Sequence, residues 1–268
     1  MILATSDSGI YEGYVDMYKT NVGYDSKSQF AKQYEYSASK KVEEASSNKT
    51  NNSSGVAGTK TVSSKDEISN WGGNYADFAG NTVEIDGLVY KCGNKGPAMP
   101  LFLQGHDNPW SSAPIYPNRS DKTVSSSGCG YTAASMAITY LTGHFVSPAE
   151  MTQKAGGKYH DPGGAGINHG SFLPWIAPQY GLQFKAVGFN EFKQGLQDGK
   201  VGITNTAAQD KSNNTWSKSG HVIAVRGLTE DGKFLVNNPN SRGEAQLNRE
   251  WTDAEMQRNC GVYYLLWK

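Results

Sequence analysis

Cys129 is the residue of this 268-residue chain whose surroundings most suggest chemistry. It lies between two glycines at the start of the segment GCGYTAASMAITYLTG (128–143), and those glycines would let a substrate carbonyl approach the backbone. A thiol reacts as the thiolate, whereas a free cysteine, with a pKa of about 8.5, is mostly protonated at neutral pH. A helix N-terminus and a neighbouring imidazole both favour the thiolate. A lone cysteine beside glycine is more often an inert packed thiol, so its partners must decide.

The chain offers five candidate bases for this thiol, namely His106, His144, His160, His169 and His221. Only His221 stands at the start of a strong strand pattern, GHVIAVRG, where a sheet would hold the ring rigidly. Because Cys129 and His221 are far apart in the sequence, they can meet only through the fold. His221 is therefore the candidate general base.

Asn238, in the segment VNNPN, is the candidate that would orient the imidazole. Its amide oxygen could accept the second ring N–H of His221 and so fix the tautomer of the ring. Asn237 is its neighbour on the same strand and would point to the opposite face. The alternative is that Asn-Pro after a strand is simply a turn.

The elements that must position these residues follow from the hydrophobic pattern. Helices are expected at 128–143, where Ala133, Ala137 and Leu141 share one face, at 147–155 with Ser147 as N-cap, and at 171–180. Strands are expected at 182–189 and 200–207, with a short helix at 190–197 between them. The segments HVIAVRGL and KFLVNNP predict a hairpin turning at 229–232, and GVYYLLWK predicts a last strand. Helices followed by an antiparallel sheet predict an α+β fold.

The first third of the chain has a different composition. Residues 1–44 form a segment whose role is not legible, and residues 45–64, with no acidic or aromatic residue, predict a flexible linker. Residues 65–96 are expected to form a lead-in with a short helix near 65–71 and a strand at 82–92. The main domain is then expected over 97–268.

Composition excludes several classes of protein. Lysine plus arginine and aspartate plus glutamate each number 25, so charge predicts no nucleic acid partner and no anionic membrane partner. No apolar stretch is long enough for a membrane span, and no export signal is recognisable at the N-terminus. Three cysteines without a CxxC pair predict neither zinc nor a disulfide framework. Cys92 and Cys260 are expected to be buried apolar residues, although they could pair in an oxidising compartment. No metal or other cofactor is expected.

Five segments resemble the C39-like group of papain-fold cysteine peptidases of bacteria and their phages. They are PLFLQGHDNPW, TVSSSGCGYTAASMAITYLTG, VSPAEMTQKAG, SGHVIAVRGL and FLVNNPNS. The resemblance implies a papain-like fold in which a helix carrying Cys129 packs on an antiparallel sheet carrying His221 and Asn238. It further implies that Cys129 is the nucleophile, His221 the base, Asn238 the orienting residue and Gln104 the side-chain donor of the oxyanion hole. The chain departs from the family at Asn238, where an aspartate more often precedes the proline.

The resemblance also suggests a substrate. Similar sequences occur in cell-wall lytic proteins of Gram-positive bacteria, phages and conjugative elements, so cleavage of peptidoglycan peptides outside the cytoplasm is expected. Trp110, Trp175 and Trp216 could form walls of the cleft or could equally be ordinary core and loop aromatics.

Two other functions remain open. One is leader-peptide processing, although the relatives that do this carry a transporter and this sequence has no membrane segment. The other is a non-catalytic structural or virion module that retains the fold, attached to a larger assembly through residues 1–60. Labelling of Cys129 by a cysteine-directed probe would distinguish an enzyme from a scaffold.

Overall fold

A computed structural model describes residues 59–62, 80–105, 108–117, 119–159, 166–206, 216–217 and 220–268. The predicted N-terminal segment 1–44, most of the predicted linker and the helix expected near 65–71 lie outside these residues. The described chain mixes helices with antiparallel sheets, which confirms the predicted α+β class.

A six-stranded antiparallel sheet carries most of the core. Its strands, in spatial order, are β10 (Glu250–Trp251), β9 (Phe234–Asn237), β8 (Val222–Leu228), β7 (Val201–Thr206), β11 (Cys260–Trp267) and β6 (Gln183–Val187). The predicted hairpin is β8 and β9, in which Val225 pairs with Val236 and Ala224 with Asn237. This register brings the start of β8 close to the end of β9.

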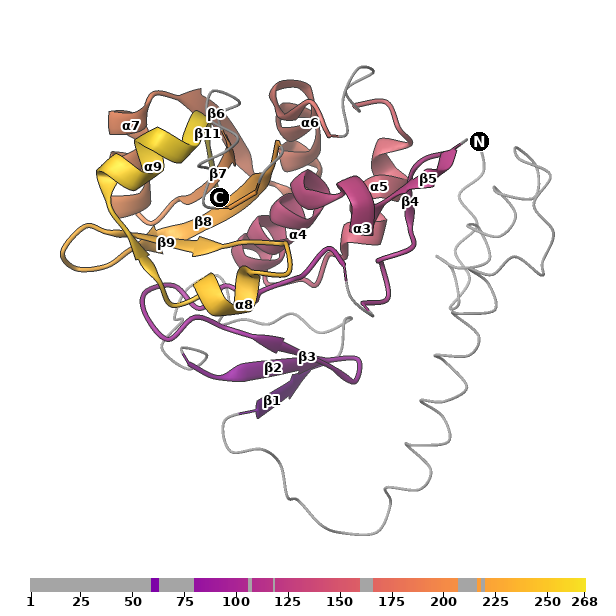
Figure 1. The fold of residues 1–268 in the computed structure, drawn as a ribbon, viewed down its shortest axis with the longest axis horizontal. Coiled ribbons are helices and arrows are strands. Elements are labelled where there is room, and N and C mark those ends of the chain that lie inside the picture. The colour runs from indigo at the N-terminus through magenta and orange to yellow at the C-terminus, as the bar shows by residue number, and fades with distance from the viewer. Residues whose placement is uncertain are drawn as a thin grey trace, which may run out of the picture. The chain divides into compact units, whose positions relative to one another are not determined.

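Helices cover both faces of this sheet. The helices of the described residues are α3 (Val124–Ser127), α4 (Cys129–Thr142), α5 (Pro148–Ala155), α6 (His169–Ile176), the 3₁₀ helix η2 (Ala177–Tyr180), α7 (Phe189–Gln197), α8 (Gly243–Gln246) and α9 (Asp253–Asn259). Figure 1 shows α4 and α6 on one side of the sheet and α7 and α9 on the other. None of the helices in the described part of the chain has the length and apolar character needed to cross a membrane.

Helix α4 is the central helix, and every residue from Cys129 to Leu141 is buried. It packs on β8 and β7, which its small residues allow because they let the helix approach the sheet closely. Gly143, at φ 78°, ends the helix, and its N–H donates to the carbonyl of Thr139 at 2.9 Å. The short helix α3 leads into α4 and is capped by Thr123, whose side chain accepts from the Ser126 N–H. Cys129 is thereby placed at the first position of α4.

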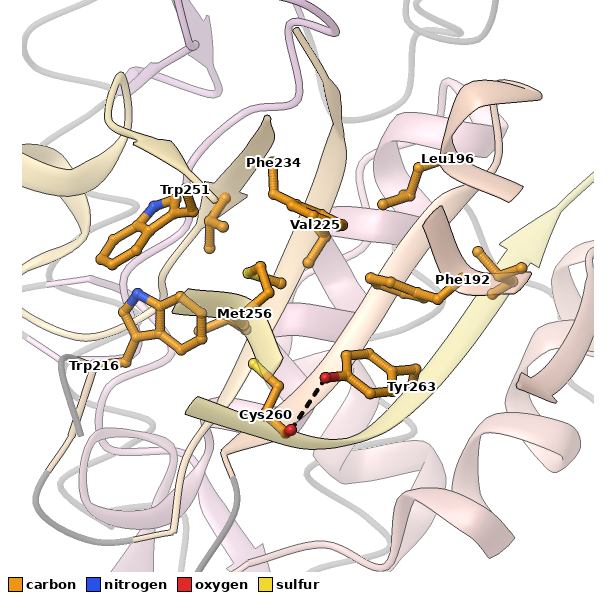
Figure 2. Packing of buried hydrophobic residues seen from close by; sticks show 12 residues of the cluster. Phe192, Leu196, Trp216, Val225, Phe234, Trp251, Met256, Cys260 and Tyr263 are labelled. Carbon is orange, nitrogen blue, oxygen red and sulfur yellow. Dashed lines mark hydrogen bonds between the residues drawn. The ribbon is translucent and has the colours of Figure 1, made fainter. Parts of the chain in front are cut away.

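The opposite face of the sheet has its own apolar core. Figure 2 shows Phe192 and Leu196 of α7 packed with Val225 of β8 and with Met256 of α9. Trp216 and Trp251 meet there with ring centroids 4.8 Å apart in a T-shaped arrangement. This layer holds β8 and β9 firmly from the side that α4 does not cover.

The lead-in residues form a second, smaller sheet. Strand β1 (Thr59–Val62) lies within the predicted linker and pairs in parallel with β2 (Thr82–Ile85), which pairs with β3 (Leu88–Lys91). The single strand expected over 82–92 is therefore a hairpin, because Asp86 and Gly87 both adopt positive φ, 51° and 79°, between its two halves. A further hairpin, β4 (Pro114–Tyr116) with β5 (Arg119–Thr123), precedes α3 and was not expected.

A buried arginine connects the lead-in to the six-stranded sheet. Arg226 of β8 is 1% exposed, and its guanidinium donates to the carbonyls of Val236, Leu247 and Lys95 and to Asn237 Oδ1. The guanidinium also fills the space beside Gly93, where the Cβ of any other residue would overlap it. Burial lowers the pKa of Arg226 to about 10. The carbonyl oxygens that accept from its guanidinium offset part of the cost of burying the charge.

Candidate active site

His221 is held by the sheet at three of its atoms. Its backbone N–H donates to Thr206 Oγ1 at 2.9 Å, and its carbonyl accepts from the Thr206 N–H at 2.8 Å. Its ring Nε2 lies 2.7 Å from Asn238 Oδ1. Both side chains are buried, with His221 6% and Asn238 0% exposed. The structure thus brings together two of the predicted site residues, in the register expected from the hairpin.

The amide of Asn238 is satisfied at both of its ends. Oδ1 also accepts from the Asn240 N–H at 3.1 Å, and Nδ2 donates to Gln246 Oε1 at 2.6 Å. Since Oδ1 is the acceptor, His221 Nε2 is the protonated ring nitrogen and Nδ1 keeps its lone pair. Gln246 is the site neighbour that sequence reasoning missed, because α8 is a single turn without apolar periodicity.

Asn237 has a different set of partners on the opposite face of β9. Its Oδ1 accepts from Arg226, and its Nδ2 donates to the carbonyls of Met99 and Pro100 at 3.0 and 3.1 Å. The two asparagines point to opposite faces as predicted, and only Asn238 bonds to His221.

Cys129 lies at the N-terminus of α4 and is 8% exposed. Burial raises the pKa of its thiol to about 11, while backbone hydrogen bonds with Val222, Gly130 and Cys129 itself act in the opposite direction. Val222 directly follows His221, so this contact brings the thiol to the start of β8. The backbone groups at the helix N-terminus lower the pKa of the thiol, as expected, but the cost of burying a thiolate is larger, so the pKa of Cys129 is raised overall.

The two glycines beside Cys129 are required by close packing. A Cβ at Gly128 would lie 2.5 Å from Val124 Cα, and a Cβ at Gly130 would overlap Ile167 Cγ2 and lie 2.5 Å from His169 Nε2. The space that a side chain would take at either residue is filled by the protein itself. Larger residues here would push the N-terminus of α4 away from its neighbours.

Gln104 is joined by a backbone hydrogen bond to the segment that follows β9. Its N–H donates to the carbonyl of Pro239, the residue after Asn238, at 2.7 Å. Its side-chain Nε2 donates to the carbonyl of Ser125 in α3 at 2.9 Å, and Oε1 is buried without a partner in the described part of the chain. One of the two Nε2 hydrogens is engaged by Ser125, which leaves the other for a further acceptor.

His169 is a second buried histidine, at the start of α6, and its Nε2 lies beside Gly130. It is 6% exposed, its Nε2 has no hydrogen-bond partner among the described residues, and burial lowers its pKa to about 4. The ring of Tyr264 stacks near it, with centroids 6.2 Å apart. Burial lowers the pKa of His221 as well, but its bond to Asn238 opposes that shift. His221 is the histidine bonded to an orienting amide.

The other candidates from the sequence have structural places. Trp110 and Trp216 are 2% and 0% exposed and belong to the core, while Trp175 is half-buried. Cys92 and Cys260 are separate buried thiols, as expected for apolar packing residues. Within the described ranges no cluster of three histidine, cysteine, aspartate or glutamate side chains could hold a metal ion.

Comparisons with known proteins give one match. The model of the Peptidase_C39 like family matches residues 104–266, which are more than half of the chain and include all four predicted site residues. A search of curated proteins finds no similar sequence.

Proposed function

Since the chain belongs to the Peptidase_C39 like family, we propose that it is a cysteine peptidase with Cys129 as nucleophile, His221 as general base, Asn238 as orienting residue and Gln104 as oxyanion donor. We propose a papain-like arrangement, in which the helix carrying the cysteine packs on a sheet carrying histidine and asparagine. The family assignment supports peptidase chemistry in general. The four roles are those that the sequence resemblance implies, and the hydrogen bond between His221 and Asn238 supports two of them.

The observation that carries the proposal is the 2.7 Å contact between His221 Nε2 and Asn238 Oδ1. This contact requires the proton of the neutral ring to lie on Nε2, which leaves Nδ1 as the basic nitrogen. The backbone N–H and carbonyl of His221 are both hydrogen-bonded to Thr206. The thiol of Cys129 interacts with the backbone of Val222, the next residue. A thiol at a helix N-terminus, in contact with the residue next to a base of defined tautomer, fits the arrangement that thiol hydrolysis requires.

The reaction then proceeds in two halves. His221 Nδ1 takes the thiol proton as the Cys129 sulfur attacks the carbonyl carbon of an amide, and Gln104 Nε2 with the Cys129 N–H stabilises the oxyanion. The tetrahedral intermediate collapses to a thioester as the imidazolium gives its proton to the leaving amine. The neutral imidazole next deprotonates a water, which attacks the thioester and releases the acid, and the proton returns to the thiolate.

The resting site starts from a neutral pair. Burial raises the pKa of Cys129 to about 11 and lowers the pKa of His221, so both shifts favour thiol and imidazole over thiolate and imidazolium. The thiol proton is therefore transferred to the imidazole as the sulfur attacks the substrate.

The substrate we propose is the peptide part of bacterial peptidoglycan, reached outside the cytoplasm by a lytic enzyme of a phage, a conjugative element or a Gram-positive bacterium. This choice rests on the sequence resemblance to cell-wall lytic proteins. Leader-peptide processing is the second peptidase activity to test, and a non-catalytic module is the alternative without turnover.

The experiment is incubation of the protein with purified peptidoglycan of several chemotypes and with a panel of soluble peptides, followed by mass spectrometry of the products. We expect release of wall fragments with new amino termini by the wild type and none by Cys129→Ala. Cleavage of soluble peptides alone would reject the wall substrate and keep the peptidase. If neither substrate is cut and iodoacetamide fails to label Cys129, the non-catalytic module replaces the proposal.

A further inference from the structure

A chain of three side chains extends from the imidazole into α8. His221 Nε2 lies 2.7 Å from Asn238 Oδ1, and Asn238 Nδ2 lies 2.6 Å from Gln246 Oε1. All three are buried, at 6%, 0% and 8% exposed. We propose that Gln246 is a positioning residue of the active site, which fixes the orientation of the Asn238 amide and through it the tautomer of His221. This inference rests on the function proposed above.

The need for such a residue follows from the asymmetry of asparagine. Rotating the amide by 180° exchanges Oδ1 and Nδ2, and would present a donor to His221 Nε2. The ring would then have to accept at Nε2 and carry its proton on Nδ1, so Nδ1 would lose the lone pair that takes the thiol proton. An aspartate has two equivalent oxygens and needs no selection of this kind. Asparagine at position 238 therefore requires an acceptor on its other side.

Gln246 supplies that acceptor. Oε1 of Gln246 can accept from Nδ2 in the observed orientation, whereas it would oppose Oδ1 after rotation of the amide. The Asn240 N–H, 3.1 Å from Oδ1, favours the same orientation but lies on the backbone. Gln246 is thus the side chain that a substitution can remove.

The position of Gln246 is fixed by the close packing of α8 on β9. A Cβ at Gly243, the first residue of α8, would overlap the carbonyl oxygen of Asn238 and lie 2.9 Å from Leu103 Cδ2. The Gln246 N–H donates to the Arg242 carbonyl at 3.1 Å, which closes the turn. Glycine at 243 therefore allows the helix to approach closely enough for the amide contact.

Four variants test the proposal. Gln246→Leu leaves Nδ2 of Asn238 unpaired, so kcat should fall about tenfold with KM nearly unchanged, as expected for loss of one buried hydrogen-bond partner. Gln246→Glu keeps the acceptor and should stay within about twofold of wild type. Asn238→Asp should retain most activity, because either carboxylate oxygen can accept from His221 Nε2. The double variant Asn238→Asp/Gln246→Glu sets two carboxylates against each other and should lose far more than the product of the single losses.

Gln179→Leu is the matched control, since Gln179 is an exposed glutamine whose Nε2 donates to the Trp175 carbonyl. It should leave kcat unchanged. Nitrogen-15 NMR of the His221 ring at neutral pH is the measurement that needs no substrate: wild type and Gln246→Glu should show the Nε2–H tautomer, and Gln246→Leu a mixture with Nδ1–H.

The outcomes separate the two proposals. A wild type that cuts no substrate rejects the proposed function, while the NMR tautomers still decide the role of Gln246. If Gln246→Leu lowers only the melting temperature and keeps both kcat and the tautomer, Gln246 is a structural residue and the inference is overturned. Should Gln246→Leu fail to fold, additive losses in the Asn238→Asp/Gln246→Glu cycle would overturn it equally.

Discussion

The sheet half and the helix half of the candidate site differ in how completely their functional groups are hydrogen-bonded. In the sheet half, His221 and Asn238 have partners for the backbone and side-chain groups that set their orientation. In the helix half, the Cys129 thiol has its pKa raised by burial, and one of the two Nε2 hydrogens of Gln104 is left for a further acceptor. The orienting groups are therefore assembled without substrate, and the reactive groups have interactions still to make.

This difference has a physical reason. The imidazole must keep one orientation while its Nδ1 takes up and releases protons, so the hydrogen bonds that hold the ring at Nε2 and at its backbone cost nothing when the substrate binds. The thiol and the oxyanion donor must exchange their interactions with those of the substrate, and groups held too firmly would resist that exchange. Substitutions in the two halves should consequently differ in what they damage.

The largest effect is expected for the reacting pair. Cys129→Ala and His221→Ala each remove a group that forms or breaks bonds, so turnover should fall by about four orders of magnitude or more. Peptide hydrolysis by each variant measures this, and the double variant should be no worse than either single one. Additive losses would show that Cys129 and His221 act separately and would reject the view that they form one site.

The next effect concerns the open half of the site. Gln104→Ala removes one oxyanion donor, so kcat should fall about a hundredfold while the melting temperature stays close to wild type. The exposed Gln179→Ala serves as control and should change neither. Unchanged turnover in Gln104→Ala would leave the oxyanion to the backbone alone.

A smaller effect is expected in the sheet half, where the two neighbouring asparagines provide a matched pair. Asn238→Ala should lower kcat by a few tens of fold, because the imidazole is misoriented. The loss is smaller than for Cys129 or His221, because an orienting group neither forms nor breaks bonds in the reaction. Asn237→Ala should leave kcat of the folded protein nearly unchanged. It should lower the free energy of unfolding by about 2 kcal/mol, because Arg226 and the buried carbonyls of Met99 and Pro100 each lose a hydrogen-bond partner. Reversed outcomes in kinetics and denaturant titration would shift the register by one residue.

The smallest effect is a dependence of stability on pH. His169 is neutral when folded because burial lowers its pKa to about 4, whereas an unfolded histidine titrates near 6.5. The unfolded state therefore binds the extra proton between these values, and stability should fall as the pH drops from about 6.5 to about 4, by up to about 1.4 kcal/mol for each pH unit.

Denaturant titrations across that range check this prediction. His169→Leu should flatten the slope without changing the kinetics assigned to His221, and the slope that remains would be that of other groups, His221 included, whose pKa burial also lowers. An unchanged slope in His169→Leu would mean that the imidazole reaches solvent in the folded protein.

Local sequence signals were sufficient where one element decides the outcome. The 128–143 pattern predicted α4, and the facing strand patterns predicted β8 and β9. The hairpin register, together with the family's preference for Asx before proline, favoured Asn238 over Asn237 as the partner of His221. The turn at Asp86-Gly87 was also present in the sequence, as a dipeptide that favours positive φ, although the segment was expected to be a single strand.

Features that depend on packing between distant segments were not predictable. The rise in the pKa of Cys129 depends on how deeply α4 is buried, and the roles of Gly128 and Gly130 depend on Val124, Ile167 and His169. Gln246 has no motif, and its contact with Asn238 exists only because α8 folds back on β9. Such features require the three-dimensional arrangement of side chains.

The buried Arg226 of β8 restricts which substitutions related sequences can accept at position 93. Because the carbonyls of Val236 and Leu247 hold the guanidinium of Arg226 in place, Gly93 cannot gain a side chain while Arg226 is present. Positions 93 and 226 should therefore covary: relatives with alanine or a larger residue at 93 should carry a shorter, uncharged residue at 226. A lineage could leave the glycine–arginine pair only through an intermediate that is either overfilled or hollow, and both are destabilised.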